Sequence, residues 1–234
     1  MRSRLLAVTF EAHDPARPAQ FWAALLGREV IEDATGALLP GDDAQLGLRF
    51  VPGRAGQLGA DNMHLHLTSA DLDEQQHTVA MALKLGGRHL DVGQRPEDEH
   101  VVLADPAGYS FCVIEPGNAY LDGCGVLGEL TCDGTREVGV FWSNVLGWPL
   151  VWDQDEETAI QSPRGGTKVA WSGEPVAPRE ESNQQRFDLV SAAGDQQAAV
   201  DELISLGATR LGIGKDGAVL LADPDGNEFC VRGA

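Results

Sequence analysis

Apolar and polar residues follow a repeating order in the first part of the chain. The stretch Leu5–Phe10 is apolar, and Asp14 with Pro15 is expected to cap and begin a helix. Apolar residues then recur at i, i+1, i+4 and i+5 from Phe21, which is the pattern of one helix face, and Gly27 is expected to end it. Three short strand-like runs follow, at Glu29–Asp33, Ala37–Pro40 and Gln45–Val51.

The same order of elements recurs directly afterwards. The pattern predicts one strand, one helix closed by a Gly-Gly pair, and three further strands. The predicted segments are Met63–Ser69, a helix from about Asp73 to Leu85, and the strands His89–Val92, His100–Ala104 and Tyr109–Glu115.

Three sequence blocks of the first half recur in the second half, in the same order and at offsets of 118 to 121 residues. Such a repeat is strong evidence for duplication. The recurring pairs are Phe21–Gly27 with Phe141–Gly147, Leu85–Leu90 with Leu206–Leu211, and Leu103–Val113 with Leu221–Val231.

The duplication predicts two domains of two modules each. The first domain is expected at 1–118, with modules 1–58 and 61–118, and the second at 119–234, with modules 124–173 and 183–234. In the second module of each domain, an Asp-Pro-x-Gly sequence begins at Asp105 or Asp223. This sequence fits a type I turn, which would join the last two strands of the module.

Composition and charge narrow the range of partners. The chain has 36 acidic and 17 basic residues, which give a formal net charge of −19 and argue against nucleic acid as a partner. No stretch approaches the roughly 20 apolar residues of a membrane helix, and the apolar run at the start is too short for a signal peptide. None of the four cysteines forms a Cys-x-x-Cys pair. We therefore expect a cytoplasmic protein, either a monomer or a homodimer, with reduced thiols.

Together the motifs resemble a known superfamily. A strand, a helix carrying Phe-Trp…Leu-Gly and a closing Asp-Pro-x-Gly-x-x-Phe-Cys-Val hairpin are similar to the glyoxalase-like branch of the vicinal oxygen chelate superfamily. This superfamily includes glyoxalases, bleomycin resistance proteins and extradiol dioxygenases. The resemblance covers nearly the whole chain and implies an α+β fold, with four βαβββ modules in two tandem domains with cupped mixed β-sheets. A ferredoxin-like array would lack the third consecutive strand of each module.

The resemblance also implies that two modules form a cup around a small-molecule ligand. We take the modules to pair within each half, and the alternation of side chains along a strand then predicts which residues face inward. In the second half, the inward-facing Glu129, Arg186, Asp188 and Glu228 are expected to pair among themselves, which leaves the first cup to bind ligand. The predicted ligand-binding residues of the first cup are Thr9, Glu11, Arg49, His64, His66 and Cys112.

Metal-dependent members of the family place His, Gln or Glu on the first and last strands of each paired module. Carried onto this chain, those positions offer His64 and Cys112 as metal ligands in the first half, and only the Cys230 thiol in the second. His66 has no counterpart among the family's ligands and is expected to be a hydrogen-bonded lining residue. The resemblance thus admits a divalent metal ion as cofactor without requiring one, and no catalytic residue is assigned.

Three functions stay open at this stage. The first is a binding protein that sequesters a natural product or metabolite without a metal, because neither half supplies three hard ligands. The alternative is a metal-dependent lyase, isomerase or dioxygenase, in which a divalent ion would polarise a substrate oxygen. The third is a scaffold whose cups are filled by side chains. The fold alone does not choose among them.

Overall fold

The computed structural model describes residues 3–54, 62–95, 97–176, 184–191 and 194–233. Module 1 comprises β1 (Ser3–Ala12), α1 (Ala16–Leu26), β2 (Ile31–Asp33), β3 (Gly36–Leu39) and β4 (Leu48–Pro52). Module 2 comprises β5 (Met63–Leu67), α2 (Leu72–Lys84), β6 (Arg88–His89), β7 (Val101–Ala104) and β8 (Ser110–Val113).

The second half begins after a short 3-10 helix, η1 (Ala119–Leu121). Module 3 comprises β9 (Leu127–Cys132), α3 (Arg136–Leu146), β10 (Leu150–Gln154), β11 (Glu157–Gln161) and β12 (Lys168–Trp171). Module 4 comprises β13 (Gln185–Ser191), α4 (Gln196–Ser205), β14 (Thr209–Ile213), β15 (Val219–Ala222) and β16 (Glu228–Arg232). The predicted order of one strand, one helix and three strands is confirmed in all four modules.

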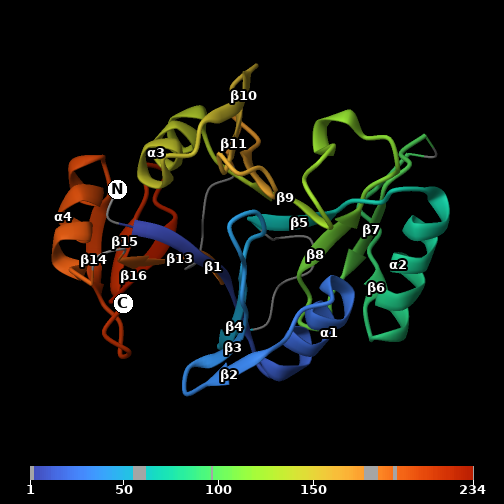
Figure 1. Ribbon diagram of the computed structural model, residues 1–234, viewed down its shortest axis with the longest axis horizontal. Helices are drawn as coiled ribbons and strands as arrows, with labels where there is room; N and C mark the ends of the chain where they lie inside the picture. Colours follow the sequence, from blue (N-terminus) through green and yellow to red (C-terminus); the bar gives the residue numbers. More distant parts are fainter. Residues whose placement is uncertain (1–2, 55–61, 96, 177–183, 192–193, 234) are drawn as a thin grey trace.

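The modules pair across the halves, so the expected pairing within each half is wrong. Sheet A has the order β14-β15-β16-β13-β1-β4-β3-β2, and sheet B has the order β10-β11-β12-β9-β5-β8-β7-β6. The antiparallel pair β1–β13 joins module 1 to module 4, and β5–β9 joins module 2 to module 3. In Figure 1, α4 and α2 lie at opposite ends of the molecule, while α1 and α3 lie nearer its middle.

The two modules of one half contact each other through helices and core rather than through a shared sheet. The Phe21 and Trp22 rings of α1, in module 1, contact Phe111 of β8, in module 2, with ring centroids 5.8 and 4.9 Å apart. In the second half, Trp142 of α3 contacts Phe229 of β16 at 5.0 Å. The modules of one half therefore associate through helix and core, which leaves the edge of each first strand to the other half.

Two of the three recurring sequence blocks meet at these helices. The indole nitrogen of Trp22 donates a hydrogen bond to Asp105 Oδ2 at 2.9 Å, and Trp142 donates to Asp223 Oδ2 at 3.2 Å. The Phe-Trp motif and the Asp-Pro-x-Gly motif are thus one structural unit. The expected N-cap is wrong, because α1 begins after Pro15 and has no side-chain cap.

The Asp-Pro-x-Gly segments are turns that join β7 to β8 and β15 to β16, as predicted. The amide of Gly108 donates to the Asp105 carbonyl at 3.1 Å, and Gly226 donates to Asp223 at 2.9 Å. Both glycines have positive φ, at 101° and 82°, in a region that favours glycine. No helix in the described part of the chain is long and apolar enough to cross a membrane.

Candidate functional site

The structure divides the six predicted ligand-binding residues between two sheets. Thr9 and Glu11 lie on β1 and Arg49 on β4, in sheet A, whereas the other three lie in sheet B. The single cup expected in the first half is therefore wrong, because the central strands pair across the halves. The residues that come together in sheet B are His64, His66 and Cys112.

Sheet B buries one face in the core and presents the other as a cup. Met63, Leu65 and Leu67 of β5 belong to the main hydrophobic core, so His64 and His66 point to the opposite face. We call this opposite face the sheet-B cup. The register aligns His66 with Cys112 of β8 on one side and with Glu129 of β9 on the other. These three side chains form one row across three central strands.

Glu129 is the best-connected polar group of this row. His66 Nδ1 and Glu129 Oε2 are 2.8 Å apart, and the side chains are only 17% and 7% exposed. The Tyr120 hydroxyl donates to Oε1 at 2.7 Å, and the Thr131 hydroxyl donates to Oε2 at 3.1 Å. A buried carboxylate is tolerated when its lone pairs are satisfied in this way.

The same contacts determine the protonation states of His66, Glu129 and His64. Burial opposes the charged form of His66, but hydrogen bonds to Cys112 and Glu129 outweigh it and raise the His66 pKa to about 9. Burial also favours a neutral Glu129, yet the bond and charge of His66 and the hydroxyls of Tyr120 and Thr131 together outweigh it and lower the Glu129 pKa. For His64, burial and then repulsion from His66 lower the pKa to about 4. At neutral pH the sheet-B cup therefore holds an imidazolium–carboxylate pair, His66 with Glu129, beside the neutral imidazole of His64.

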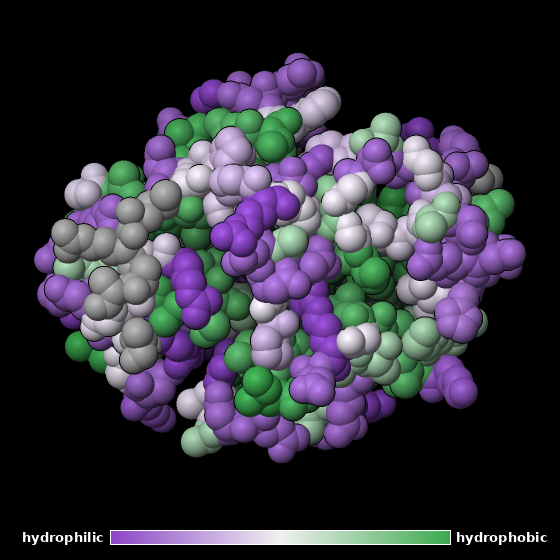
Figure 2. Space-filling model, in the orientation of Figure 1, coloured by the Kyte–Doolittle hydropathy of each residue, from purple (hydrophilic) through white to green (hydrophobic). Residues whose placement is uncertain are grey.

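A cavity of about 390 Å³ opens beside this pair. Its lining includes His66, Glu129 and Thr131 together with Tyr120, and Trp152 from β10. The Tyr120 and Trp152 rings lie 6.0 Å apart at 83° and form two walls of the cavity. The hairpin of β10 and β11, which carries Trp152, ends in hydrophilic residues (Figure 2). The cavity thus combines aromatic walls with a charged pair.

The segment between the halves covers part of the sheet-B cup. Leu121 and Cys124 pack with Cys112 and Ile114 in a small hydrophobic cluster, against which Tyr120 also packs. The Lys168 ammonium lies 3.9 Å from the centre of the Tyr120 ring and donates a hydrogen bond to the Tyr120 carbonyl. Sequence reasoning treated this segment as a linker and missed Tyr120, because nothing in its composition indicates that it folds over a sheet.

His64, His66 and Cys112 fit a metal ion in their chemistry. Their ligand atoms all lie within 4.8 Å of one another. Imidazole nitrogens and a thiol suit borderline and soft divalent ions such as zinc. Two of these residues, His64 and Cys112, are the metal ligands predicted from the sequence, and the structure places His66 beside them.

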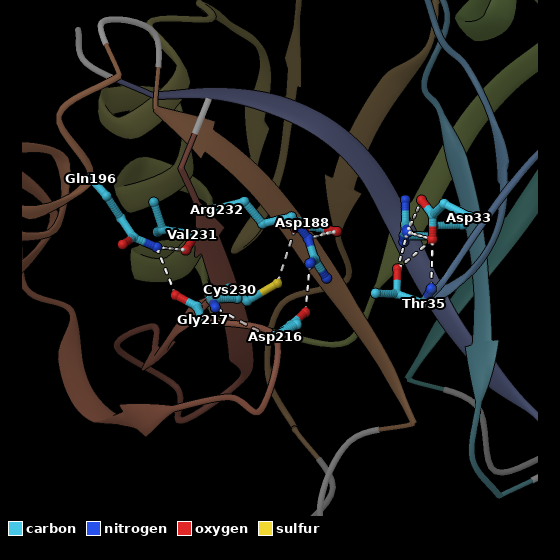
Figure 3. A network of polar contacts seen from close by, with 11 residues as sticks. Asp33, Thr35, Asp188, Gln196, Asp216, Gly217, Cys230, Val231 and Arg232 are labelled. Atoms are coloured by element: carbon cyan, nitrogen blue, oxygen red, sulfur yellow. Dashed lines mark hydrogen bonds and ion pairs between the residues drawn. The ribbon is translucent and has the colours of Figure 1, made fainter.

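The opposite face of sheet A, the sheet-A cup, carries ion pairs instead. The Arg232 Nε donates to both carboxylate oxygens of Asp188, at 2.9 and 2.8 Å, and its Nη1 lies 2.5 Å from Asp216. The Cys230 thiol donates to Asp188 Oδ1 at 3.1 Å. Burial, followed by the negative charge of Asp188, raises the Cys230 pKa to about 12. Figure 3 shows this network, and Asp33 with Thr35 apart from it.

Two further arginines of the sheet-A cup also have acidic partners. Arg49 lies 2.6 Å from Asp33, and Arg186 lies 3.3 Å from Glu11. The expectation that Glu129, Arg186, Asp188 and Glu228 pair among themselves is therefore wrong for Glu129, Arg186 and Asp188. Asp188 binds Arg232 of module 4 instead, and Arg186 reaches module 1. Glu129 belongs to the other cup altogether.

Solved structures show the same fold at low sequence identity. Glyoxalase I from Zea mays aligns with a TM-score of 0.64 and 15% identity, over 98% of this chain and 92% of that chain. A candidate dioxygenase from Bacillus subtilis aligns with a TM-score of 0.62 and 13% identity, over 97% of this chain and 84% of that chain. No curated protein has a significantly similar sequence.

The family model of the Glyoxalase-like domain matches twice, at residues 7–114 and 128–232. These two matches cover most of the chain and correspond to the duplicated halves. The paired βαβββ modules and the eight-stranded mixed sheets agree with this match. The chain therefore belongs to the Glyoxalase-like family and carries two copies of its domain.

Proposed function

We propose that the sheet-B cup binds a small organic molecule. The observation that carries this proposal is the cavity of about 390 Å³ next to the His66–Glu129 pair. Ligand pockets commonly have volumes of roughly 300–1,000 Å³ and combine apolar walls with a few polar groups. Here Tyr120 and Trp152 supply the walls, and His66 supplies a charged donor. The natural role of such a cup is to sequester a metabolite or natural product.

The sheet-A cup is a weaker candidate for the same role. A ligand there would displace the partners of Arg232 or Arg186 and leave buried charge uncompensated. Asp188 is fully buried, so the loss of its partner would be especially costly. In the sheet-B cup, by contrast, the space beside the ion pair already exists, and a ligand need not break the pair to enter.

A ligand screen tests this proposal. We expect a thermal-shift screen of aromatic and carbonyl-containing metabolites to give hits that perturb the NMR signals of His66 and of the Trp152 indole. The Trp152→Ala variant should bind such a hit about 5- to 30-fold more weakly, since losing an aromatic wall costs roughly 1–2 kcal/mol. Val151→Ala is the matched control, because Val151 is the exposed neighbour of Trp152 on β10. Perturbations confined to Arg186 and Cys230 would contradict the proposal.

A metal-dependent lyase, isomerase or dioxygenase is the second candidate function. The observation that favours it is the group of His64, His66 and Cys112, which would hold the ion. A bound divalent ion would supply polarisation of a substrate oxygen. Glu129 holds His66 in place, and the walls of the cavity orient the substrate. Mass spectrometry of a bound ligand after long incubation separates the two functions. An unchanged ligand supports sequestration, and product formation that a chelator stops supports the enzyme.

A further inference from the structure

We infer that a cavity beside the segment that connects the two halves is a binding site for a small organic cation with an ammonium group and an alkyl body. We call it the connector cavity. Its volume is about 670 Å³, and among the described residues it shares none of its lining with the cavity beside His66 and Glu129. The site goes beyond the proposed function and does not depend on it.

The walls of the connector cavity are held together by hydrogen bonds. One wall is the junction of β5 and α2, and the other is the segment 114–126, which links β8 to β9. The Thr68 amide donates to the Val126 carbonyl at 3.0 Å, and the Thr68 hydroxyl donates to the Gly125 carbonyl at 2.8 Å. A ligand therefore meets a site that is already formed, which limits the entropic cost of binding.

The charged groups of the lining are acidic. Glu74, Glu115 and Asp122 line the cavity, and its described lining includes no lysine, arginine or histidine. None of the three carboxylates forms an ion pair with a basic side chain in the described part of the chain. Glu74 Oε2 accepts the Ala70 amide at 2.6 Å, and Glu115 Oε1 accepts the Asn118 side-chain amide at 3.0 Å. The three negative charges therefore favour a cation in this cavity and repel an anion.

A buried hydroxyl gives a second, independent indication of a ligand. Ser69 lines the cavity and is only 9% exposed, and its Oγ has no hydrogen-bonding partner among the described residues. Its neighbour Ala70 is exposed, which places Ser69 on the inner side of the cavity. Buried polar atoms are nearly always paired, so this one requires an explanation. An ammonium group in the cavity would donate a hydrogen bond to it.

The remaining lining offers apolar surface for the body of the ligand. Ile114 and Leu121 are 7% and 5% exposed and belong to the small hydrophobic cluster that also contains Cys112. Val126, in contrast, is 48% exposed. An alkyl chain that covers Val126 would remove apolar surface from water, which is favourable. Carboxylates beside apolar surface are thus suited to an alkylammonium ion.

The spacing of the carboxylates favours an organic cation over a metal ion. Oxygen atoms that hold one metal ion must lie close together. Glu74, Glu115 and Asp122 are not among the described residues that bring three donor atoms within reach of one ion. Their charges are instead distributed around the lining, where they attract a cation without fixing one coordination geometry. The matching ligand is therefore an organic ammonium ion rather than calcium or magnesium.

The 3-10 helix η1 separates the connector cavity from the cavity of the proposed function. Tyr120 lines the cavity of the proposed function, whereas its chain neighbours Ala119 and Leu121 line the connector cavity. A ligand in either cavity can thus be located by NMR, from the Trp152 indole in one case and from the Val126 amide in the other.

Titration of the full chain with hexylammonium chloride, followed by amide NMR, tests the site. We expect saturable shifts of the Ser69 and Val126 amide signals and an unchanged Trp152 indole signal. Hexan-1-ol should bind roughly tenfold more weakly because it lacks the charge, and hexanoate should not bind. Added salt should weaken the binding of hexylammonium and leave the binding of hexan-1-ol unchanged.

Two variants separate the contributions of the charges and of the hydroxyl. The double variant Glu115→Gln, Asp122→Asn should weaken hexylammonium binding about tenfold and change hexan-1-ol binding by less than about twofold. Ser69→Ala should weaken hexylammonium binding about threefold without lowering the melting temperature, because the hydroxyl has no described partner to lose. Asp73→Asn is the matched control and should bind like the unaltered chain, because Asp73 is exposed, precedes Glu74 and is not among the lining residues.

Three results would overturn the site: no saturable shifts with hexylammonium, equally strong binding of hexanoate, or shifts confined to the Trp152 indole. Unchanged affinity in the double variant would overturn it as well. Thermal melts show whether each variant folds, and the single variant Asp122→Asn, at an exposed position, replaces a double variant that does not. The ligand screen of the other cavity is independent of these outcomes, so either site can fail without the other.

Discussion

The two cups place a cysteine at the same point and surround it with opposite chemistry. Cys112 and Cys230 occupy matching positions in the recurring hairpin block. Cys112 is aligned with His66, which is paired with Glu129. Cys230 is aligned with Asp188, which is paired with Arg232. One cup therefore has an imidazole beside its thiol, and the other has a carboxylate.

This difference shows how one scaffold carries two roles. A carboxylate beside the thiol disfavours the thiolate and, with its arginine, forms a satisfied ion pair that strengthens the sheet. An imidazole beside the thiol leaves donor atoms directed toward a cavity. We therefore expect substitutions in the sheet-A cup to affect mainly stability, and substitutions in the sheet-B cup to affect mainly binding.

The largest effect is expected from Asp188→Ala in the sheet-A cup. Asp188 is fully buried and its removal leaves Arg232 without its main partner, so we expect a loss of about 3–5 kcal/mol in the free energy of unfolding. Urea denaturation measures it. Asp216→Ala is the control and should cost under about 1 kcal/mol, because Asp216 is 31% exposed. Equal losses for the two variants would show that the buried pair does not stabilise this cup.

Glu129→Ala tests the corresponding pair in the sheet-B cup. It removes the partner of His66 and leaves the Tyr120 hydroxyl without its acceptor, so we expect a loss of about 1–3 kcal/mol. The loss should be smaller than for Asp188→Ala, because His66 can give up its proton whereas Arg232 cannot. Glu157→Gln, at an exposed position of the same cavity, should change stability by less than about 0.5 kcal/mol. A greater loss for Glu129→Ala than for Asp188→Ala would reverse the comparison.

The pH dependence of stability should reveal the His66–Glu129 pair. The His66 pKa rises from 6.5 to about 9 on folding, so its contribution is complete below pH 6.5 and disappears as the pH rises toward 9. We expect the unaltered chain to lose on the order of 2–3 kcal/mol more than His66→Gln between these limits. Unfolding curves across that range measure the difference, and NMR titration of the His66 ring gives the pKa directly. A ring that titrates near pH 6.5 would refute the pairing.

The smallest expected effect on stability is at the β7–β8 and β15–β16 hairpins. Substitutions there should destabilise the two cups equally. Gly108→Ala and Gly226→Ala place a side chain at φ of 101° and 82°, so each should lose about 1 kcal/mol of unfolding free energy. Thermal melts of both variants, with Gly212→Ala as control, measure the cost. Gly212 does not have a positive φ, and no atom lies within 4 Å of a Cβ added there. Markedly different losses at Gly108 and Gly226 would show that the scaffold itself distinguishes the cups.

The order of helices and strands within each module was predictable from the sequence. The pairing of each module's first strand with a strand of another module was not. The Phe-Trp and Asp-Pro-x-Gly blocks indicated the helices and hairpins, because each depends on residues close in sequence. The β1–β13 and β5–β9 pairs were missed, since all four modules share one alternation and any two first strands could pair. Glu129 was predicted to face a cup, yet only this pairing places it beside His66.

The pairing of β1 with β13 also has a consequence during synthesis. Roughly 170 residues separate the end of β1 from the start of β13, so at about 5–20 residues per second the ribosome needs about 10–35 s to supply the missing partner. Until then, the edge of β1 that will bind β13 has free amide and carbonyl groups. Unpaired strand edges promote aggregation, so a chain truncated after the first half would expose such an edge on both β1 and β5. The nascent protein thus depends on protection of its first strand until almost its last module has emerged.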